Sequence, residues 1–289
     1  MYLCDDLIRQ VDATEISGPC AIGALVGAIT GLLLGVPFVV ASFSGMGWVL
    51  LATTGTIVLV TAGYLAAKYT APDTSELFRG FLIGMNAGLT FALATAVGRV
   101  FLVSGWALAI GSVLGAIVLV AAVRTVSQSA IYQGILGWSS ALMPPTWVVN
   151  ALGLAFFTLS LLGALVTLGR APALAITGIA IHRQTGTIFL RGGWIANLNR
   201  EQTAFDMGHF GFVHKDSPSY YLEHETGHTL SLGAFGSVFH LVGFIDEMSP
   251  AGSAAYSEQL AEGHDPAGTG PMLPMWSCGE PDIAARGRA

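Results

Sequence analysis

Long stretches without a charged residue constrain this chain more than any other feature of its sequence. Asp, Glu, Lys and Arg are absent from residues 16–67, 80–98, 100–123 and 125–169. A helix that crosses the hydrocarbon core of a bilayer needs about 20 predominantly apolar residues. The first stretch is long enough for two such helices, and each of the others is long enough for one.

These stretches predict a membrane α-helical domain over residues 19–170, with about five transmembrane helices. The spans are expected near residues 21–43, 47–67, 80–103, 105–123 and 148–168. Buried helices of a soluble protein would need polar faces and charged ends, which these segments lack. Residues 125–147 are uncharged but polar, aromatic and interrupted by proline, so we expect an interfacial or re-entrant segment there.

The first span follows a polar N-terminal segment, residues 1–18, which contains four acidic residues. A signal peptide would begin with a short basic stretch, so we expect the first span to be retained. In this span Gly23, Gly27, Gly31 and Gly35 recur at every fourth position and therefore share one helix face. We interpret this face as tight helix packing within one chain rather than as an oligomer interface.

The composition excludes several classes of function. Hydrophobic residues make up 53% of the chain and charged residues 10%, with a net charge of −6. Without a basic cluster, the chain lacks the electrostatic signature of a nucleic-acid-binding protein. The spans also lack the acidic and basic residues that transporter pathways use. We expect a lipid bilayer as partner and no nucleic acid, and we leave open a homo-oligomer or a larger membrane complex.

After Arg170 the chain changes character, and residues 171–264 predict an α+β region. Two β-rich segments, near residues 174–182 and 187–196, indicate a hairpin, and a third extended segment is expected over residues 204–213. Ser217 and Pro218 indicate the start of a helix that continues through Leu230 and stops at Gly233. Residues 265–289 form a Gly- and Pro-rich tail that could cover a site or dock a partner.

The predicted helix after Pro218 contains the sequence His224-Glu225-Thr226-Gly227-His228, an H-E-x-x-H motif. Residues four apart share one face of a helix, so both imidazoles can bind one zinc ion. Glu225 can then act on a water molecule at the metal. The sequence therefore predicts a zinc site with His224 and His228 as ligands.

A catalytic zinc site needs a third protein ligand, which we expect downstream of the motif. Glu247 follows an apolar stretch, whereas Glu258 lies in the sequence YSEQLAE, which predicts a short helix that ends at Gly263. We prefer Glu258 as the ligand and keep Glu247 as the alternative. Glu262 lies one turn after Glu258, where it could accept the second ring N–H of a ligating histidine.

The H-E-x-x-H motif, followed by E-x-x-A on a second helix, resembles the pattern of the gluzincin metallopeptidases, which include membrane-embedded prenyl-protein and heat-shock peptidases. The segments 205–210 and 222–229, with Gly243, are also similar to a group of small bacterial membrane proteins with an H-E-x-G-H-T core. The chain departs from the peptidase pattern at Glu262, where the peptidases usually carry Asp or Asn. The resemblance covers the C-terminal third of the chain and implies a zincin-like fold.

The resemblance also implies a mechanism. Zinc held by His224, His228 and Glu258 would activate a water molecule, and Glu225 would take its proton as the peptide carbonyl is attacked. The expected protein is thus a zinc metallopeptidase of a bacterial inner membrane, acting on a peptide or a membrane protein. The side on which its C-terminal region lies stays open, because a crossing by residues 125–147 would reverse it.

Two points remain open at the site. His264, His240 and Tyr256 are the candidates for a further hydrogen-bond donor to the transition state. The competing interpretation of the motif is a non-catalytic structural or accessory membrane subunit, whose zincin-like metal site contributes folding energy alone. Glu225 separates the two interpretations, because a structural zinc site has no use for a general base between its ligands.

Overall fold

The computed structural model describes residues 16–40, 46–198, 204–217, 221–249, 255–264 and 272–277. The chain divides into two compact units, and each is described by itself. The first unit comprises Met1–Tyr132, Met143–Pro145 and Ala234–Asp246, and the second comprises Gln133–Leu142, Thr146–Gly233 and Glu247–Ala289.

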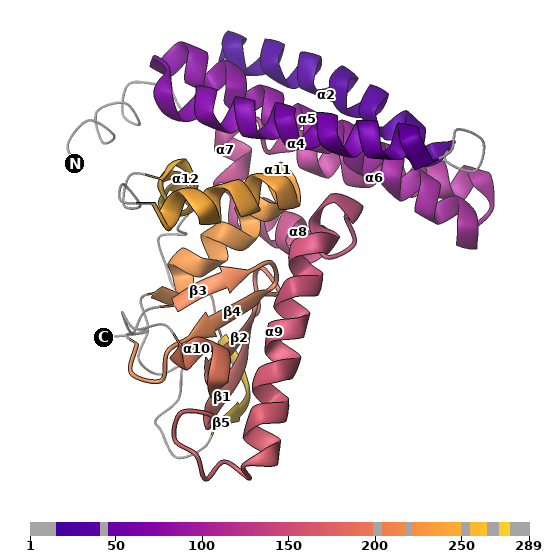
Figure 1. The fold of residues 1–289 in the computed structure, drawn as a ribbon. Coiled ribbons are helices and arrows are strands. Elements are labelled where there is room, and N and C mark those ends of the chain that lie inside the picture. The colour runs from indigo at the N-terminus through magenta and orange to yellow at the C-terminus, as the bar shows by residue number, and fades with distance from the viewer. Residues whose placement is uncertain are drawn as a thin grey trace. The chain divides into compact units, whose positions relative to one another are not determined.

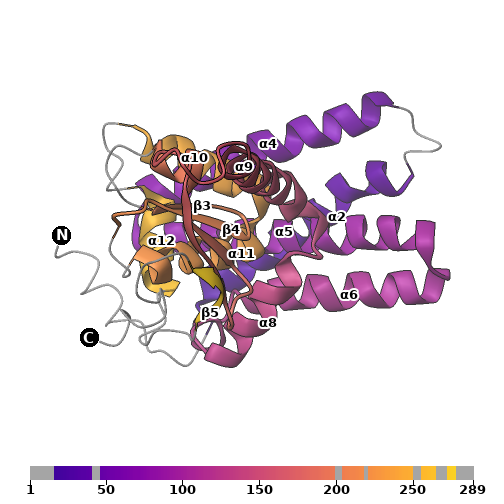
Figure 2. The ribbon, with the colours of Figure 1, turned by 90° about the horizontal axis from the view of Figure 1, so that it is seen from below.

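The first unit is a bundle of apolar helices (Figures 1 and 2). Its helices are α2 (Gly18–Val39), α4 (Met46–Tyr69), α5 (Pro72–Phe101), α6 (Ser104–Val120) and the short α7 (Arg124–Ser127). The long α5 packs against α2, α4 and α6 and is the most buried of them. Helix α5 is therefore the centre of the bundle.

Glycines allow the backbones of α2 and α5 to touch. A Cβ atom added to Gly27 would lie 2.0 Å from the carbonyl oxygen of Phe81, and one added to Gly31 would lie 2.1 Å from that of Met85. Gly84 of α5 meets the carbonyl oxygen of Ala24 in the same way. The glycine face of the first span thus packs within the chain, which confirms the prediction for this face.

Five helices in the described part of the chain are long and apolar enough to cross a membrane. They are Gly18–Val39, Met46–Tyr69, Pro72–Phe101, Pro144–Val166 and Leu222–Glu247. The number of these helices agrees with the prediction, but one of them is not a predicted span. The span expected at residues 105–123 is α6, a helix of 17 residues that measures about 26 Å against a hydrocarbon core of about 30 Å. The fifth helix of the set is instead the one that contains the H-E-x-x-H motif.

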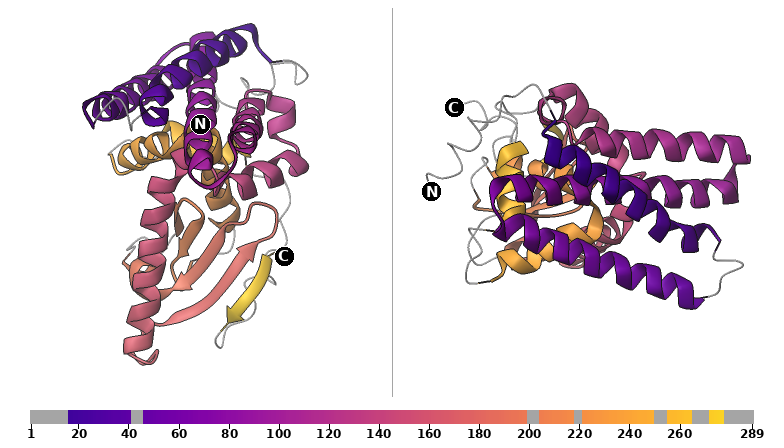
Figure 3. Two further views of the ribbon diagram at one scale, coloured as in Figure 1. Left: turned by 90° about the vertical axis from the view of Figure 1, so that its right-hand side faces the viewer. Right: turned by 90° about the horizontal axis from the view of Figure 1, so that it is seen from above.

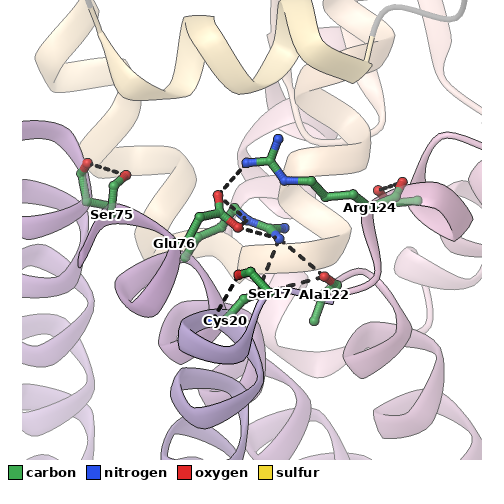
Figure 4. Close-up of polar contacts among 9 residues, drawn as sticks. Ser17, Cys20, Ser75, Glu76, Ala122 and Arg124 are labelled. Carbon is green, nitrogen blue, oxygen red and sulfur yellow. Dashed lines mark hydrogen bonds and ion pairs between the residues drawn. The ribbon is translucent and has the colours of Figure 1, made fainter. Parts of the chain in front are cut away.

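A network of charged side chains ties helix ends together in the first unit (Figure 4). Glu76 accepts hydrogen bonds from Arg79, at 3.1 Å, and from Arg124. The Arg79 guanidinium also donates to the carbonyl oxygen of Ala122 at 3.2 Å and lies 3.3 Å from the sulfur of Cys20. Because these residues come from α2, α5 and the segment around α7, the network fixes the three segments to one another.

Helix α11 (Tyr221–Glu247) continues past Gly233, where the sequence predicted its end. Its one non-helical residue is Gly236, with φ 83° and ψ 175°. Positive φ is unfavourable for residues with a Cβ atom, and a Cβ here would also lie 2.8 Å from the Asn86 amide oxygen. The helix therefore consists of two halves joined at Gly236.

The second half of α11 is fixed to α4 by hydrogen bonds. Asp246 accepts one from the Tyr64 hydroxyl at 2.7 Å and one from the Lys68 ammonium at 2.6 Å. The Lys68 and Asp246 side chains are only 7% and 15% exposed. This is a buried ion pair whose members satisfy one another, as charges away from water require.

The second unit combines helices with a small sheet. Its elements are most of α8 (Ala130–Ser140), then α9 (Trp147–Val166), β1 (Ile176–His182), β2 (Ile188–Gly192), α10 (Gly193–Asn197), β3 (Ala204–Met207), β4 (Phe210–Val213), the first half of α11, α12 (Tyr256–His264) and β5 (Met272–Ser277). The strand order is β3-β4-β2-β1-β5, with β2 and β4 parallel and the other pairs antiparallel. Figure 3 shows β5 at one edge of the sheet.

The sheet packs along α9 (Figure 1). A Cβ at Gly153 would lie 2.1 Å from the Met207 carbonyl oxygen, so the helix and β3 are in direct backbone contact. Phe156 packs edge-on against Phe212, with ring centroids 6.1 Å apart. The opposite face of α9 exposes large apolar side chains along its whole length, among them Val148, Leu152, Leu159, Leu162 and Val166.

The extended segment expected over residues 204–213 is a tight hairpin of two strands, β3 and β4, rather than one strand. Gly208 turns the chain with φ 77°, and the Asn150 side chain occupies the space that a Cβ would need. The Asn150 oxygen accepts a hydrogen bond from the backbone N–H of His209 at 3.0 Å. A positive-φ glycine held by a side chain from α9 therefore sets the turn.

A chain of hydrogen bonds crosses the interior of the second unit from β1 to α11. His182 Nδ1 lies 2.8 Å from the Thr185 hydroxyl, which lies 2.8 Å from that of Thr187. Thr187 donates to the hydroxyl of Thr229 at 3.0 Å, and Thr229 donates to the carbonyl oxygen of Gly208 at 3.0 Å. These contacts fix α11 to both hairpins of the sheet.

His182, at the buried end of this series of hydrogen bonds, should make the stability of the protein depend on pH. Burial lowers the pKa of His182 to about 4, whereas an imidazole in an unfolded chain has a pKa of about 6.5. The unfolded state therefore binds more protons as the pH falls from 6.5 to 4. The free energy of unfolding should decrease over this window, by on the order of 3 kcal/mol for this group.

We expect His182→Gln to lose this contribution, so that its melting temperature in detergent depends less on pH between 6.5 and 4 than that of the wild type. Thermal unfolding of both proteins across this range measures the difference. Parallel curves for the two proteins would show that His182 is not the group responsible.

Candidate metal centre

The two histidines of the motif lie in the first turns of α11 and converge. Their Nε2 atoms are 3.1 Å apart, because residues four apart on a helix share one face. The His228 side chain is 8% exposed and that of His224 is 24% exposed. The motif thus presents two ring nitrogens to a single point, with one side open to solvent.

Glu258 of α12 completes the group. Its carboxylate oxygens lie 2.9 Å from His224 Nε2 and 3.2 Å from His228 Nε2. Ligand atoms about 2.1 Å from a tetrahedral zinc ion lie about 3.4 Å from one another, which is close to these separations. Among the described residues, His224, His228 and Glu258 are the only group of His, Cys, Asp and Glu side chains spaced to hold a metal ion.

Close backbone contact between α11 and α12 brings Glu258 near the two histidines. A Cβ added to Gly227 would lie 2.4 Å from the carbonyl oxygen of Ala261 on α12. Glu258 lies one turn before Ala261, so it faces the part of α11 on either side of Gly227. The glycine inside the motif is therefore what allows the third donor to approach.

The two histidines favour the ionised form of the Glu258 carboxyl group. Burial alone would raise the pKa of its carboxyl group, but the hydrogen bonds with His224 and His228 outweigh burial and hold the pKa well below its usual value. An ionised carboxylate is the form that binds a metal ion. The charge state of Glu258 thus suits the role of a ligand.

Glu247, the alternative third ligand, lies outside the group of three donors. It accepts a hydrogen bond from the Ser257 hydroxyl at 2.7 Å, and its carboxyl group interacts with that of Glu258. Ser257 belongs to the first turn of α12. Glu247 therefore holds the start of the helix that contains Glu258.

Glu225 is buried, at 3% exposure, beside the three donors. Its carboxylate interacts electrostatically with His228, His224 and Glu258. Glu225 is thus close to the donor group without being part of it, which is the arrangement that a general base requires.

The other residues singled out in the sequence have different placements. Glu262 and His264 lie in α12, but their side chains fall outside the described residues. Tyr256 is buried at the start of α12, two residues before Glu258. His240 belongs to the second half of α11, in the first unit, whereas the three donors belong to the second.

Asp206 is a buried acidic residue that acts electrostatically on the donor group and that the sequence did not suggest. It lies on β3 and is 5% exposed. Burial raises the pKa of Asp206 well above its usual value, opposed by the attraction of His228 and reinforced by the repulsion of Glu225, Glu247 and Glu258. The only signal in the sequence was an acidic residue between Phe205 and Met207 in an otherwise apolar segment.

The site therefore gathers more acidic than basic groups. Four carboxyl groups, those of Asp206, Glu225, Glu247 and Glu258, interact with one another around the two imidazoles. Buried carboxylates repel one another unless a positive charge compensates them. A divalent cation bound by the three donors would supply that charge, so the electrostatics and the donor geometry both fit a metal ion.

Comparison with protein-family models, with curated proteins and with solved structures finds no match to this chain. Conclusions about the function of the site therefore rest on its own geometry.

The contact at Gly227 leads to a prediction for Gly227→Ala. The added Cβ must push α12 away from α11, and a metal site tolerates a displacement of only about 0.5 Å, so we expect zinc affinity to fall by about tenfold or more. Competition with a chelating dye measures the affinity. Gly163→Ala on α9 is the matched control, because the nearest atom to its added Cβ lies 3.9 Å away. Equal affinities in the two variants would contradict the assignment of this contact.

Proposed function

We propose that this protein is an integral membrane zinc metallopeptidase, with His224, His228 and Glu258 as zinc ligands and Glu225 as general base. The observation that carries the proposal is the convergence of three side chains from α11 and α12, whose ligand atoms lie 2.9 to 3.2 Å apart, with a buried Glu225 beside them. The gluzincin-like sequence pattern supports the same assignment.

A lipid bilayer as the environment is supported by the five long apolar helices. Large apolar side chains are exposed along α2, α4, α6 and α9, as expected of helix faces that contact lipid. The similarity of the motif region to small bacterial membrane proteins supports a bacterial inner membrane.

The number and exposure of the donors favour catalysis over a purely structural metal site. Structural zinc sites usually have four protein ligands, whereas catalytic sites have three and keep one position open. Here three donors are grouped, and the side chains of His224 and Glu258 are 24% and 26% exposed. A buried carboxylate next to the donors has a use in hydrolysis and none in a structural site.

Zinc, when bound, would act as a Lewis acid and lower the pKa of a coordinated water molecule to about 7. Glu225 would accept a proton from the attacking water at a carboxylate oxygen and pass it to the nitrogen of the leaving amine. Glu258 and Glu247 would keep the start of α12 in place during this step. Tyr256 and His264 remain the candidates to donate a hydrogen bond to the oxyanion.

Metal content and hydrolysis together test the proposal. We expect about one zinc per chain in the detergent-purified wild type, the same content in Glu225→Gln and Glu247→Ala, and loss of zinc in Glu258→Ala. Elemental analysis measures the content, and cleavage of a fluorescently labelled unfolded protein measures activity. Glu225→Gln should lower the cleavage rate by at least about a hundredfold at unchanged zinc content.

Two results would contradict the proposal in different ways. Zinc at full occupancy in a wild type that cleaves nothing would favour the structural or accessory subunit. A wild type that binds no zinc after reconstitution would remove both the peptidase and the structural metal site.

A further inference from the structure

Helix α9 has two faces of opposite character. One face packs on protein at positions that recur every three or four residues, namely Asn150, Gly153, Phe157, Ser160 and Gly163. The opposite face exposes apolar side chains along the helix, and α9 contains no charged residue. An exposed apolar face of this length marks a surface that contacts a membrane or another protein.

Contacts with the sheet accompany α9 along most of its length, and Figure 1 shows the helix running beside the strands. Asn150, in the first turn, accepts a hydrogen bond from the backbone N–H of His209 at 3.0 Å. Near the other end, a Cβ added to Gly163 would lie 3.9 Å from Leu174 and 4.0 Å from Trp194 of α10. Asn150 and Gly163 are about 20 Å apart along the helix axis. The sheet therefore follows α9 over a distance of about two thirds of a hydrocarbon core.

This packing is incompatible with a crossing of the bilayer by α9, because the sheet would have to enter the hydrocarbon with the helix. Within the described residues β3 and β5 are the edge strands, and the backbone groups of an open sheet edge find no partner in lipid. Strand β4 also leads directly into Lys215 and Asp216, whose side chains are 41% and 49% exposed. Exposed charges need water, so the sheet side of α9 must face water.

A lipid surface is the partner that fits the opposite face. The same chain contains helices long and apolar enough to cross a membrane, so a bilayer lies within its reach. Exposed tryptophans flank α9, with Trp147 at its first residue and Trp194 beside Gly163, and tryptophan is enriched at the boundary between lipid and water. An exposed Arg170 follows the helix, where its charge complements lipid phosphate.

We propose that α9 is an interfacial helix, which lies along the membrane surface with its exposed face in the lipid and the sheet on the water side, and does not cross the bilayer. This inference rests on the proposed membrane embedding of the chain, but not on zinc or on catalysis. Thr229, next to His228, donates a hydrogen bond to Gly208, the turn residue that Asn150 of α9 contacts. An interfacial α9 thus keeps the metal donors near the lipid–water boundary.

Nitroxide labels that report depth in a bilayer test the orientation. Single cysteines at Val148, Ala155 and Leu162 sample the exposed face of α9 every seven residues, over about 21 Å of helix. They are introduced into the full chain after its three native cysteines are replaced by alanine. The labelled protein is reconstituted into vesicles of phosphatidylcholine and phosphatidylglycerol, and thermal unfolding against the unlabelled parent checks its folding.

Helix α4 provides the matched control. Leu51, Val58 and Leu65 have the same spacing, are also exposed, and belong to a helix that is long and apolar enough to cross. The accessibility of each label to oxygen, relative to a water-soluble nickel chelate, measures its depth. The three α9 labels should share one depth, about 5–10 Å below the headgroups. On α4 the central label should lie about 10 Å deeper than the outer two, because these approach opposite membrane surfaces.

Each other outcome on α9 overturns the proposal in its own way. A deep central label, as expected on α4, would show that α9 crosses the bilayer. Free access of the nickel chelate to all three labels would show that this face contacts water, and dipolar broadening between labels would assign the face to a second copy of the chain.

The control separates this inference from the proposed function. Labels on α4 that lie outside the lipid would contradict an integral membrane protein, whereas a uniform shallow depth on α9 would still support binding to the membrane surface. The measurement needs neither bound zinc nor cleavage. A protein that fails as a peptidase therefore leaves the orientation of α9 fully decidable.

Discussion

Contact between helix backbones is the constraint on which most of this structure depends. At Gly227 and Ala261, α11 and α12 approach so closely that no side chain fits between them. The short helix is thereby held where Glu258 reaches both imidazole nitrogens. The same device recurs in the first unit, where the glycines of α2 let its backbone touch that of α5. In apolar surroundings the hydrophobic effect gives little preference for one helix pairing, so close van der Waals contact through small residues is what specifies it.

The balance of charge around the three metal-donor side chains is the second feature that determines the properties of the site. Two imidazoles stand among four carboxyl groups in a largely buried region. Ionising all four carboxyl groups together is unfavourable without a cation, and the hydrogen bonds from Ser257 to Glu247 and from the histidines to Glu258 stabilise the charges of two of them. An arrangement that lowers the stability of the fold in this way is typical of a binding site rather than of a packed core.

Charge-free stretches predicted the apolar helices well, because a run of about 20 apolar residues without a charge is typical of a helix that crosses a bilayer. Helical periodicity predicted that His224 and His228 share one helix face, and the predicted helix downstream contains Glu258, which the structure groups with them. The boundaries were less predictable. The absence of charged residues does not predict that α6 ends at Val120. The sequence also does not predict whether Gly233 or Gly236 interrupts α11, because the conformation of Gly236 depends on its contact with Asn86 of another helix. Asp206 was missed because the charged groups that act on it lie far away in the sequence, and no local pattern links an edge strand to a helix face.

The break at Gly236 has a consequence for how α11 responds to mechanical or thermal disturbance. A continuous helix behaves as a stiff rod, and a twist applied at one end turns every side chain along it. Gly236 departs from helical φ and ψ, so it acts as a joint between the half with the histidines and the half anchored through Asp246 and Lys68. The positions of His224 and His228 are therefore set by the contacts of the first half of α11, namely the hydrogen bond from Thr229 to Gly208 and the backbone contact of Gly227 with Ala261.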